Sequence, residues 1–482
     1  MAHPPLTIRN LTLTPTELKL VEHYEPPQSW SNNISIASII KSFTTFISQI
    51  ISPPSQQQCA TYTTNFSKHD ISIPIEPYEA KKTNIQPNPN DIFRFTFETD
   101  GQRYRLDAPT PPLRSAVLTD LSSDPQHRYT AIYLPKFSYL ALFPSTDPRS
   151  WMSSLKDGYP LSALSIPGTH NSPAHYIALP SVRCQVATIK EQLENGVRFL
   201  DIRLQPENPS DLSKDELLLV HSAFSVSLTG NKYFRDVVND VLAFLDRNPS
   251  ETIIMSLKRE GLGKATDQQL SKILRDHYAT DPSRWFTEPR IPTLGEARNK
   301  IVIIRRLRID DSLNGEWNGA GWGIDAESWP DNCTDGICGS GDIRIQDFYD
   351  LEVTAKIERK IEYSIAQLER AAQRVWTSVS EEVKAVEAAI AKQPLFINFL
   401  SASNFFRPGY WPERIAARVN PSIIDFLCRR HNERGESDRE GNAIGDGSTG
   451  IVVCDWVGSN GDWDLVKCII GYNARLNTRE KR

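Results

Sequence analysis

The stretch Ser165-Ile166-Pro167-Gly168-Thr169-His170-Asn171-Ser172 decides the fold of this 482-residue chain. It completes a short apolar run, residues 161–166, which predicts a buried strand. Pro167-Gly168 then interrupts the regular structure, so we expect His170 on a loop just beyond the C-terminal end of that strand. One such histidine is weak evidence by itself, but the same arrangement recurs along the chain.

Strand-like and helical patterns alternate from about residue 150 onward. The strands are almost continuously apolar, which favours a parallel sheet covered by helices. Over this length we predict an α/β fold, an irregular (β/α) TIM-type barrel; an open doubly wound sheet is the second interpretation. No glycine-rich phosphate loop follows the first strand, which counts against the second interpretation. The predicted strands are residues 161–166, 197–204, 216–220, 252–257, 300–304, 395–400 and 450–454, and the predicted helices are 184–194, 233–246, 267–277, 353–392, 411–430 and 463–476.

Residues 1–150 have a different pattern from the barrel region, 151–482. Four segments alternate at period two, and prolines are dense between them, which predicts a small β-rich sandwich domain of unknown role. These segments are residues 6–13, 93–98, 103–106 and 129–134. The polar, proline-rich stretch around residues 52–90 predicts a mobile loop.

Residues 36–50 are apolar at helical spacing and end before Pro53-Pro54. Two interpretations stay open: an amphipathic helix that inserts into a membrane interface, or one that packs on its own domain. The polar face carries serines, threonines and Lys41 but lacks the several lysines and arginines usual in membrane-binding helices, which favours packing.

Bulk composition excludes several classes of protein. With 39% hydrophobic and 23% charged residues the chain resembles ordinary globular proteins, and a net charge of -5 provides no basic field for nucleic acid. We see no signal peptide in the first residues and no apolar run of ~18 residues that would span a membrane. We therefore expect a cytoplasmic protein, or one peripheral on a membrane, of open oligomeric state. The seven cysteines form no disulfide framework; Cys333 and Cys338 either close a small loop or remain thiols.

Charged or imidazole side chains end six of the predicted strands. In a barrel these ends converge on one rim, where active sites are built. The residues are His170, Asp201 with Arg203, His221, Lys258, Arg305 with Arg306, and Asp455.

This set suits cleavage of a phosphodiester. One histidine can take a proton from an attacking hydroxyl while another protonates the leaving oxygen. A guanidinium can neutralise the phosphate oxygens, and a carboxylate such as Asp455 can orient the basic imidazole. Metal catalysis is the competing hypothesis, but Arg203 places a cation beside Asp201, the only carboxylate on that strand.

Seven segments resemble the catalytic X domain of phosphatidylinositol-specific phospholipases C, most closely the bacterial, metal-independent branch. They are residues 166–170, 201–203, 248–258, 300–306, 329–332, 346–349 and 396–399. The resemblance covers residues 150 to about 465 and implies an irregular barrel. It further implies cleavage of phosphatidylinositol to diacylglycerol and inositol 1,2-cyclic phosphate, without a cofactor.

The resemblance also implies roles for the catalytic residues. His170 would be the general base, oriented by Asp455, and His221 the general acid. Arg203, beside Asp201, would take the place that calcium holds in eukaryotic relatives.

Four further residues match substrate-binding positions of the family. Lys258, Arg306 and Asp347 would hydrogen-bond the inositol hydroxyls, and Tyr349 would stack on the ring. The partners implied are an inositol phospholipid and, transiently, a membrane surface. Trp317, Trp322 and Trp329 either form a rim that enters lipid or cover the barrel mouth.

Asn171 departs from the bacterial pattern, which has aspartate there. Asparagine is the choice of calcium-dependent members, so Asn171 points toward calcium while Arg203 points away from it. A fixed positive charge and a divalent cation share one phosphate pocket poorly, so calcium is disfavoured. Two alternatives stay open: action on another inositol- or glycerol-containing phosphodiester, or a weakly active module that binds lipid head groups, which Asn171 alone favours.

Overall fold

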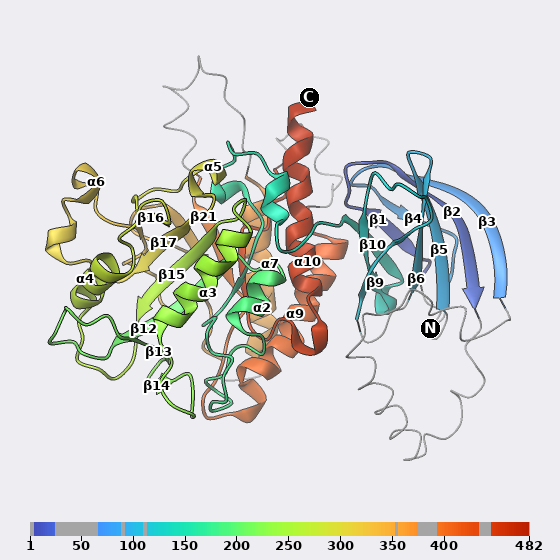
Figure 1. Ribbon diagram of the computed structural model, residues 1–482. Coiled ribbons are helices and arrows are strands. Elements are labelled where there is room, and N and C mark those ends of the chain that lie inside the picture. Colours follow the sequence, from blue (N-terminus) through green and yellow to red (C-terminus); the bar gives the residue numbers. More distant parts are fainter. Residues whose placement is uncertain are drawn as a thin grey trace. The chain divides into compact units, whose positions relative to one another are not determined.

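Buried β-strands form the core of both halves of the chain. The computed structural model describes residues 4–24, 66–87, 92–108, 113–351, 355–374, 393–432 and 445–481. The chain divides into two compact units, Met1–Ser145 and Thr146–Arg482, coloured from blue to red along the sequence in Figure 1. The amphipathic segment 36–50 and the later part of the helix predicted to reach residue 392 lie outside the described residues.

The first unit is a β-sandwich. Its two five-stranded sheets have the orders β4-β1-β10-β9-β7 and β3-β2-β5-β6-β8. Both sheets contribute to one apolar core: Ile8 and Leu140 come from the first sheet, Leu18 and Phe95 from the second, and all four are fully buried. The alternation of buried and exposed residues along these strands fixes which face of each sheet points inward. The strands are β1 (Thr7–Asn10), β2 (Thr16–Tyr24), β3 (Phe66–Ile75), β4 (Ala80–Lys82), β5 (Ile92–Thr99), β6 (Gln102–Ala108), β7 (Ser115–Val117), β8 (Thr119–Asp120), β9 (Tyr129–Leu134) and β10 (Tyr139–Pro144).

The mobile loop predicted around residues 52–90 is wrong for the part that the structure describes. Strand β3 pairs antiparallel along β2, and β4 pairs with β1. Ile71, Ile73 and Ile75 alternate with polar or proline residues at period two, which is a strand pattern. The proline-rich, polar composition of the whole stretch obscured this local alternation. Residues 52–65 lie outside the described ranges.

The second unit is an irregular, open β/α barrel. Its main sheet has the order β16-β17-β15-β12-β11-β22-β21-β20-β19, and every neighbouring pair from β17 to β20 is parallel. In the described ranges, no strand pairing closes the sheet between the β17 and β20 sides. The strands are β11 (Ile166–Thr169), β12 (Phe199–Pro206), β13 (Leu217–His221), β14 (Phe224–Ser225), β15 (Ile253–Arg259), β16 (Trp285–Phe286), β17 (Ile301–Arg306), β18 (Ile324–Asp325), β19 (Gly336–Ile337), β20 (Ile343–Gln346), β21 (Leu395–Phe399) and β22 (Ile451–Cys454).

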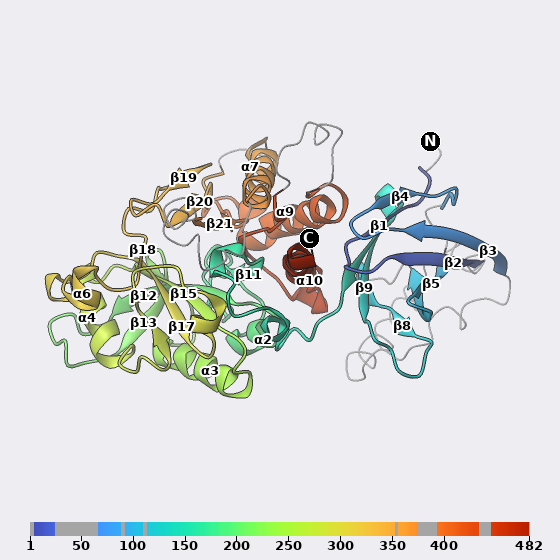
Figure 2. The same cartoon turned by 90° about the horizontal axis from the view of Figure 1, so that it is seen from above.

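Amphipathic helices cover the outside of this sheet (Figure 2). Helix α9 shows why: Ile415, Val419, Ile423 and Leu427 recur every fourth residue and are all fully buried. Helix α10 contacts β11, α7 contacts β20 and β21, and α9 packs against both of these helices. None of the helices within the described ranges has the length and hydropathy to cross a membrane. The helices are α2 (Ile189–Glu194), α3 (Phe234–Arg247), α4 (Asp267–His277), α5 (Leu294–Ala297), α6 (Glu316–Gly319), α7 (Ala355–Ala372), α9 (Pro412–Arg429) and α10 (Asp464–Gly471).

Three local features of the barrel differ from the predictions. The helix expected over 184–194 begins only at Ile189, where Thr188 and Glu191 form a capping box. The strand predicted over 216–220 is present as β13, but it runs antiparallel to β12 rather than within the parallel series. Strand β20 was not predicted, although Ile343 and Ile345 alternate with polar residues.

The first barrel strand also lies later than predicted. Residues 161–163 form a short 3-10 turn, and Pro167 and Gly168 lie inside strand β11 instead of ending it. The close approach of β12 explains the glycine: a Cβ on Gly168 would lie 2.9 Å from a ring carbon of Phe199 and 3.2 Å from its carbonyl oxygen. Because β11 carries His170 at its end, this contact sets the position of the histidine.

We expect Gly168→Ala to destabilise the barrel by about 1–3 kcal/mol, because the added methyl group overpacks the contact between β11 and β12. Urea unfolding followed by tryptophan fluorescence measures this, since nine of the ten tryptophans follow residue 150. Gly158→Ala is the matched control, because a Cβ there meets no atom within 4 Å. Equal stability of the two variants would contradict the packing argument.

Candidate active site

Three cations stand level on three neighbouring parallel strands. Arg203 on β12 pairs in register with Lys258 on β15, and Lys258 pairs with Arg306 on β17. Residues paired across a sheet point to the same face. The three side chains therefore form one row at the C-terminal ends of the strands.

Two carboxylates hold this row of cations. Asp201 accepts a hydrogen bond from Arg203 Nε at 3.2 Å and faces Arg306 Nη1 at 3.4 Å. Glu260 accepts from Arg203 Nη1 and from Lys258 Nζ, both at 2.8 Å. Sequence reasoning missed Glu260, yet its spacing gave a signal: residues 258 and 260 share one face of an extended chain.

The ion pairs keep both Arg203 and Asp201 in their charged forms. Burial opposes the charged form of Arg203, but the attraction of Glu260 and Asp201 outweighs burial and raises the pKa of the guanidinium. Burial likewise opposes the charged form of Asp201, but Arg203 and Arg306 outweigh it and lower the pKa of the carboxyl. The guanidinium is therefore a fixed charge at the mouth of the barrel.

His170 is oriented by a buried carboxylate. Its backbone N–H donates to Cys454 O at 3.0 Å, which ties the loop after β11 to the end of β22. The next residue, Asp455, lies with Oδ1 2.9 Å from His170 Nδ1. A proton on Nδ1 directed at this carboxylate leaves Nε2 with its lone pair, as a general base requires. Gln185 Nε2 donates to the carbonyls of His170 and Cys454 at 2.7 and 2.9 Å, a brace for which the sequence gives no signal.

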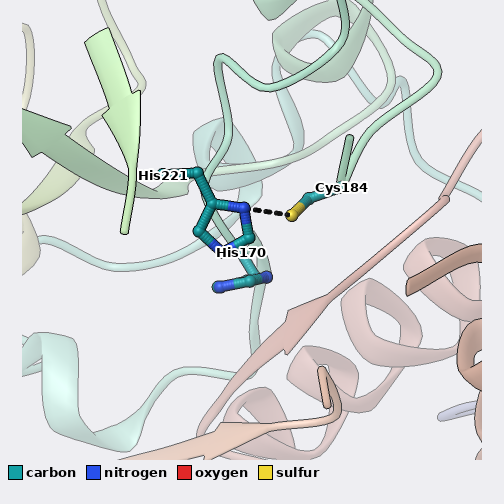
Figure 3. Close-up of side chains that lie close together, drawn as sticks. All are labelled: His170, Cys184 and His221. Carbon is teal, nitrogen blue, oxygen red and sulfur yellow. Dashed lines mark hydrogen bonds between the residues drawn. The ribbon is translucent and has the colours of Figure 1, made fainter. Parts of the chain in front are cut away.

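His221 reaches the same place from the antiparallel hairpin. Because β13 runs back along β12, its last residue returns into the barrel mouth, and the rings of His221 and His170 lie 5.4 Å apart, edge to face. His221 Nδ1 lies 2.9 Å from Val182 O and 3.6 Å from Cys184 Sγ (Figure 3). Burial, followed by the charge of Arg203, lowers the pKa of His221 to about 3. The imidazole is therefore neutral near pH 7, with Nδ1–H donated to the Val182 carbonyl.

Asn171 lies beside the row of cations, where it contacts Asp201. Its φ of +36° is left-handed, a conformation that asparagine tolerates better than most residues. Its backbone N–H donates to Asp201 Oδ2 at 3.0 Å, and its Nδ2 donates to Val220 O at 3.3 Å. Its Oδ1 is buried and has no hydrogen-bond partner in the described part of the chain.

An aromatic and acidic wall lies beside Arg306. The guanidinium sits 3.7 Å over the ring of Trp329, whose Nε1 donates to Asp347 Oδ2 at 3.0 Å. Arg306 Nη2 lies 3.8 Å from the same carboxylate oxygen. Tyr349 is half exposed, and its hydroxyl donates to Asp331 Oδ1 at 2.7 Å. The four residues matched to substrate binding are thus brought to one mouth.

The three loop tryptophans do not form one rim. Trp322 is buried and Trp329 packs against Arg306, so only Trp317 is exposed. A glycine-rich loop leaves open which side chains turn inward, so their common exposure could not be predicted. Cys333 and Cys338, also in this region, are both thiols in the structure.

Comparison with known proteins finds a matching protein family and similar bacterial proteins. Residues 158–307 match the family model for "Phosphatidylinositol-specific phospholipase C, X domain". A 1-phosphatidylinositol phosphodiesterase of Listeria monocytogenes is 31% identical over 225 residues, which are 44% of this chain and 57% of that protein. One from Staphylococcus aureus is 26% identical over 345 residues, 68% of this chain and 95% of that protein.

The fold is shared with solved structures. A pentafluoro-Phe-incorporated phosphatidylinositol-specific phospholipase C from S. aureus aligns with a TM-score of 0.51 at 24% identity, covering 68% of this chain and 97% of that one. The second unit therefore has the irregular barrel fold of these solved structures. The match to the phosphatidylinositol-specific phospholipase C X domain over residues 158–307 agrees with the sequence resemblance.

The buried, neutral His221 makes folding sensitive to acid. Its pKa is about 3 in the fold and 6.5 ordinarily, so its contribution to stability is complete above pH 6.5 and is lost as pH falls toward 3. From about pH 7.5 to about pH 5 this single group accounts for a loss of about 2 kcal/mol. We expect His221→Gln to reduce the pH dependence of the free energy of unfolding by that amount, measured by urea titration at both pH values. Parallel profiles for the variant and the parent would contradict the assignment.

Proposed function

We propose that this chain cleaves phosphatidylinositol by attack of the inositol 2-hydroxyl on phosphorus, releasing diacylglycerol and inositol 1,2-cyclic phosphate. The observation that carries the proposal is the pair of facing imidazoles beside the fixed charge of Arg203. The named activity of the bacterial relatives supports the substrate. The chain spans only 57% of the Listeria protein, and Met1–Ser145 form a separate unit whose role stays open.

In the first half of the step, His170 Nε2 takes the proton of the 2-hydroxyl as a new bond forms between that oxygen and phosphorus. Asp455 positions the imidazole and stabilises the imidazolium that results. Arg203 neutralises the charge that builds on the phosphate oxygens. The attacking hydroxyl is on the carbon next to the phosphate ester, so the ring closure is favoured by proximity.

In the second half, the bond from phosphorus to the glycerol oxygen breaks, and His221 protonates that oxygen. His221 is neutral in the free protein, so it must gain a proton when the substrate binds. An anionic phosphodiester bound beside the two rings favours the charged imidazolium, which offsets burial and the nearby guanidinium. Each turnover transfers one proton in and one out, so the protein needs no other reactant.

The substrate-binding residues favour a ring rich in hydroxyl groups. Lys258, Arg306 and Asp347 supply donors and acceptors, and Tyr349 supplies an exposed aromatic face. A glycerol head group offers fewer hydroxyls and no ring to stack. Polar clamps beside a stacking surface are therefore better matched to inositol.

We infer that calcium takes no part in this reaction. The oxygens of Asp201 and Glu260 already face Arg203, Arg306, Lys258 and backbone N–H groups. Three oxygens of the described site residues have no partner, Asn171 Oδ1, Gln185 Oε1 and Asp455 Oδ2, whereas calcium takes about six to eight oxygens. The site residues are thus a poor match for that ion.

We expect purified protein to form inositol cyclic phosphate from phosphatidylinositol equally with and without EDTA, followed by phosphorus NMR. His170→Ala should lower kcat at least about a hundredfold, because the general base is removed. His127→Ala, in the first unit, is the matched histidine control.

Three results would redirect this proposal. Activity that needs calcium would make Asn171 the better guide to the mechanism. Head-group binding that survives in the parent without turnover would favour a binding module. Faster cleavage of a different phosphodiester would change the substrate.

We further propose that an aromatic cluster at the barrel mouth touches the membrane. Phe224, three residues after His221, stacks on Phe405 at 5.2 Å, and Phe405 contacts Phe406 at 5.2 Å. All three are exposed, Phe406 by 88%. Aromatic side chains exposed beside a site for a lipid suit a membrane interface, where their rings leave water.

Phe406→Ser should weaken binding to phosphatidylinositol-containing vesicles about tenfold, because a large apolar side chain no longer leaves water. Vesicle co-sedimentation gives the affinity. Val117→Ser, which changes a residue 61% exposed in the first unit, is the control. A loss that is equally large on a dispersed, water-soluble substrate would place Phe406 in substrate binding instead.

A further inference from the structure

The proposed reaction makes no use of Cys184, although its thiol faces both histidines. Donor atoms of His170, Cys184 and His221 lie within 4.8 Å of one another (Figure 3). Among the residues that the structure describes, no other three histidine, cysteine or acidic side chains form such a group. The Sγ atom is buried and lies 3.4 Å from Val182 O and 3.6 Å from His221 Nδ1.

We propose that His170, Cys184 and His221 bind a thiophilic divalent cation such as Zn²⁺, and that the bound ion switches the enzyme off. The binding site stands by itself; the inhibition rests on the proposed function.

The spacing suits a tetrahedral ion. With Zn–S near 2.3 Å and Zn–N near 2.0–2.1 Å, sulfur and nitrogen ligands of one zinc lie about 3.5 Å apart. Cys184 Sγ and His221 Nδ1 already have this separation, at 3.6 Å. The widest separation in the group is within 4.8 Å, so side-chain rotations of about 1 Å complete the set. A water or a substrate oxygen can fill the fourth position.

The surroundings orient the imidazole of His170 as a metal ligand. Asp455 Oδ1 holds His170 Nδ1 at 2.9 Å and leaves Nε2 for an ion, an arrangement common around zinc-bound histidines. In His221 the nitrogen nearest Cys184 Sγ is Nδ1, which lies 2.9 Å from the Val182 carbonyl, so an ion bound by Nδ1 replaces that hydrogen bond. The contact that prepares His170 for proton transfer thus also prepares it for a metal.

The charges around the group are nearly balanced. The mouth holds four carboxylates and three cations, and the buried amine of Lys360, whose pKa burial lowers to about 7, adds part of a fourth cation beside Asp347 and Asp455. The nearby guanidinium of Arg203 is already paired with two of these carboxylates. The charge that favours a bound cation is therefore that of the thiolate, which forms on binding. The charged groups are Asp201, Glu260, Asp347 and Asp455, with Arg203, Lys258, Arg306 and Lys360.

The donor set discriminates between ions. A thiolate and two imidazoles are soft or intermediate ligands, which select zinc and related metals over calcium or magnesium. On binding, the Cys184 thiol gives its proton to solvent and its sulfur to the metal. An ion held there occupies the nitrogen that His170 needs as a base and draws His221 away from its leaving oxygen. Both proton transfers stop together.

The inhibition test uses the full chain purified in EDTA. We expect Zn²⁺ to inhibit the parent protein reversibly and Ca²⁺ to have no such effect. For each variant, activity is normalised to its own value in EDTA. Cys184→Ser should raise the half-inhibiting Zn²⁺ concentration at least about tenfold, because a ligand is removed. Cys428→Ser, which alters another buried thiol on α9, should behave as the parent does.

A second measurement tests the site without any lipid. An equimolar amount of Co²⁺ should give the parent and Cys428→Ser a thiolate-to-cobalt charge-transfer band in the near ultraviolet, and Cys184→Ser should lack it. This spectrum stands even where no phosphatidylinositol cleavage occurs, so it separates failure of the site from failure of the proposed function. If Cys184→Ser does not fold by circular dichroism, Cys184→Ala carries the same expectation.

Two outcomes overturn the proposal. Absence of the band in the parent, or its persistence without Cys184, would remove the site. Equal zinc inhibition of the parent and Cys184→Ser would show that the ion acts elsewhere.

Discussion

The site depends on one buried arrangement, the guanidinium of Arg203 held between Asp201 and Glu260. Taking these charges out of water is costly, and only close pairing makes it tolerable. The parallel register meets this need because it sets Arg203, Lys258 and Arg306 level and places the carboxylates between them. The result is a rigid positive surface whose charge does not vary near neutral pH. Under the proposed function, this surface is already arranged for an anionic phosphate, which is the condition for strong electrostatic catalysis.

The residues at the strand ends could be found from the sequence. The apolar strand patterns locate the strand ends, and in a barrel these ends converge on one mouth. Sequence reasoning placed His170, Arg203, His221, Lys258, Arg306 and Asp455 in one mouth, and the structure brings them together. It could not find Cys184 or Gln185, which lie on the irregular loop that precedes α2. Their contacts depend on the path of that loop, and an irregular loop has no periodic sequence pattern from which its path could be predicted.

The errors also have physical causes. Proline and glycine usually end a strand, but in β11 the missing Cβ of Gly168 is what allows Phe199 to approach. In the sandwich, polar composition over some forty residues concealed a period-two segment that pairs along β2. The three tryptophans share a loop, yet one is buried, one stacks on Arg306 and one is exposed. In each case a tertiary contact determined the local structure, and the average composition of the segment did not indicate that contact.

The imidazoles of His170 and His221 are carried by different parts of the fold, because His221 ends the antiparallel strand β13. His170 is fixed by β11 and β22 in the middle of the sheet, whereas His221 ends a hairpin strand that pairs with β12 and β14 and bridges to Tyr233. A change in the length or packing of that hairpin would shift His221 and leave His170 in place. The two imidazoles of the site therefore belong to separately built parts of the barrel, one to its central sheet and one to a hairpin at its side.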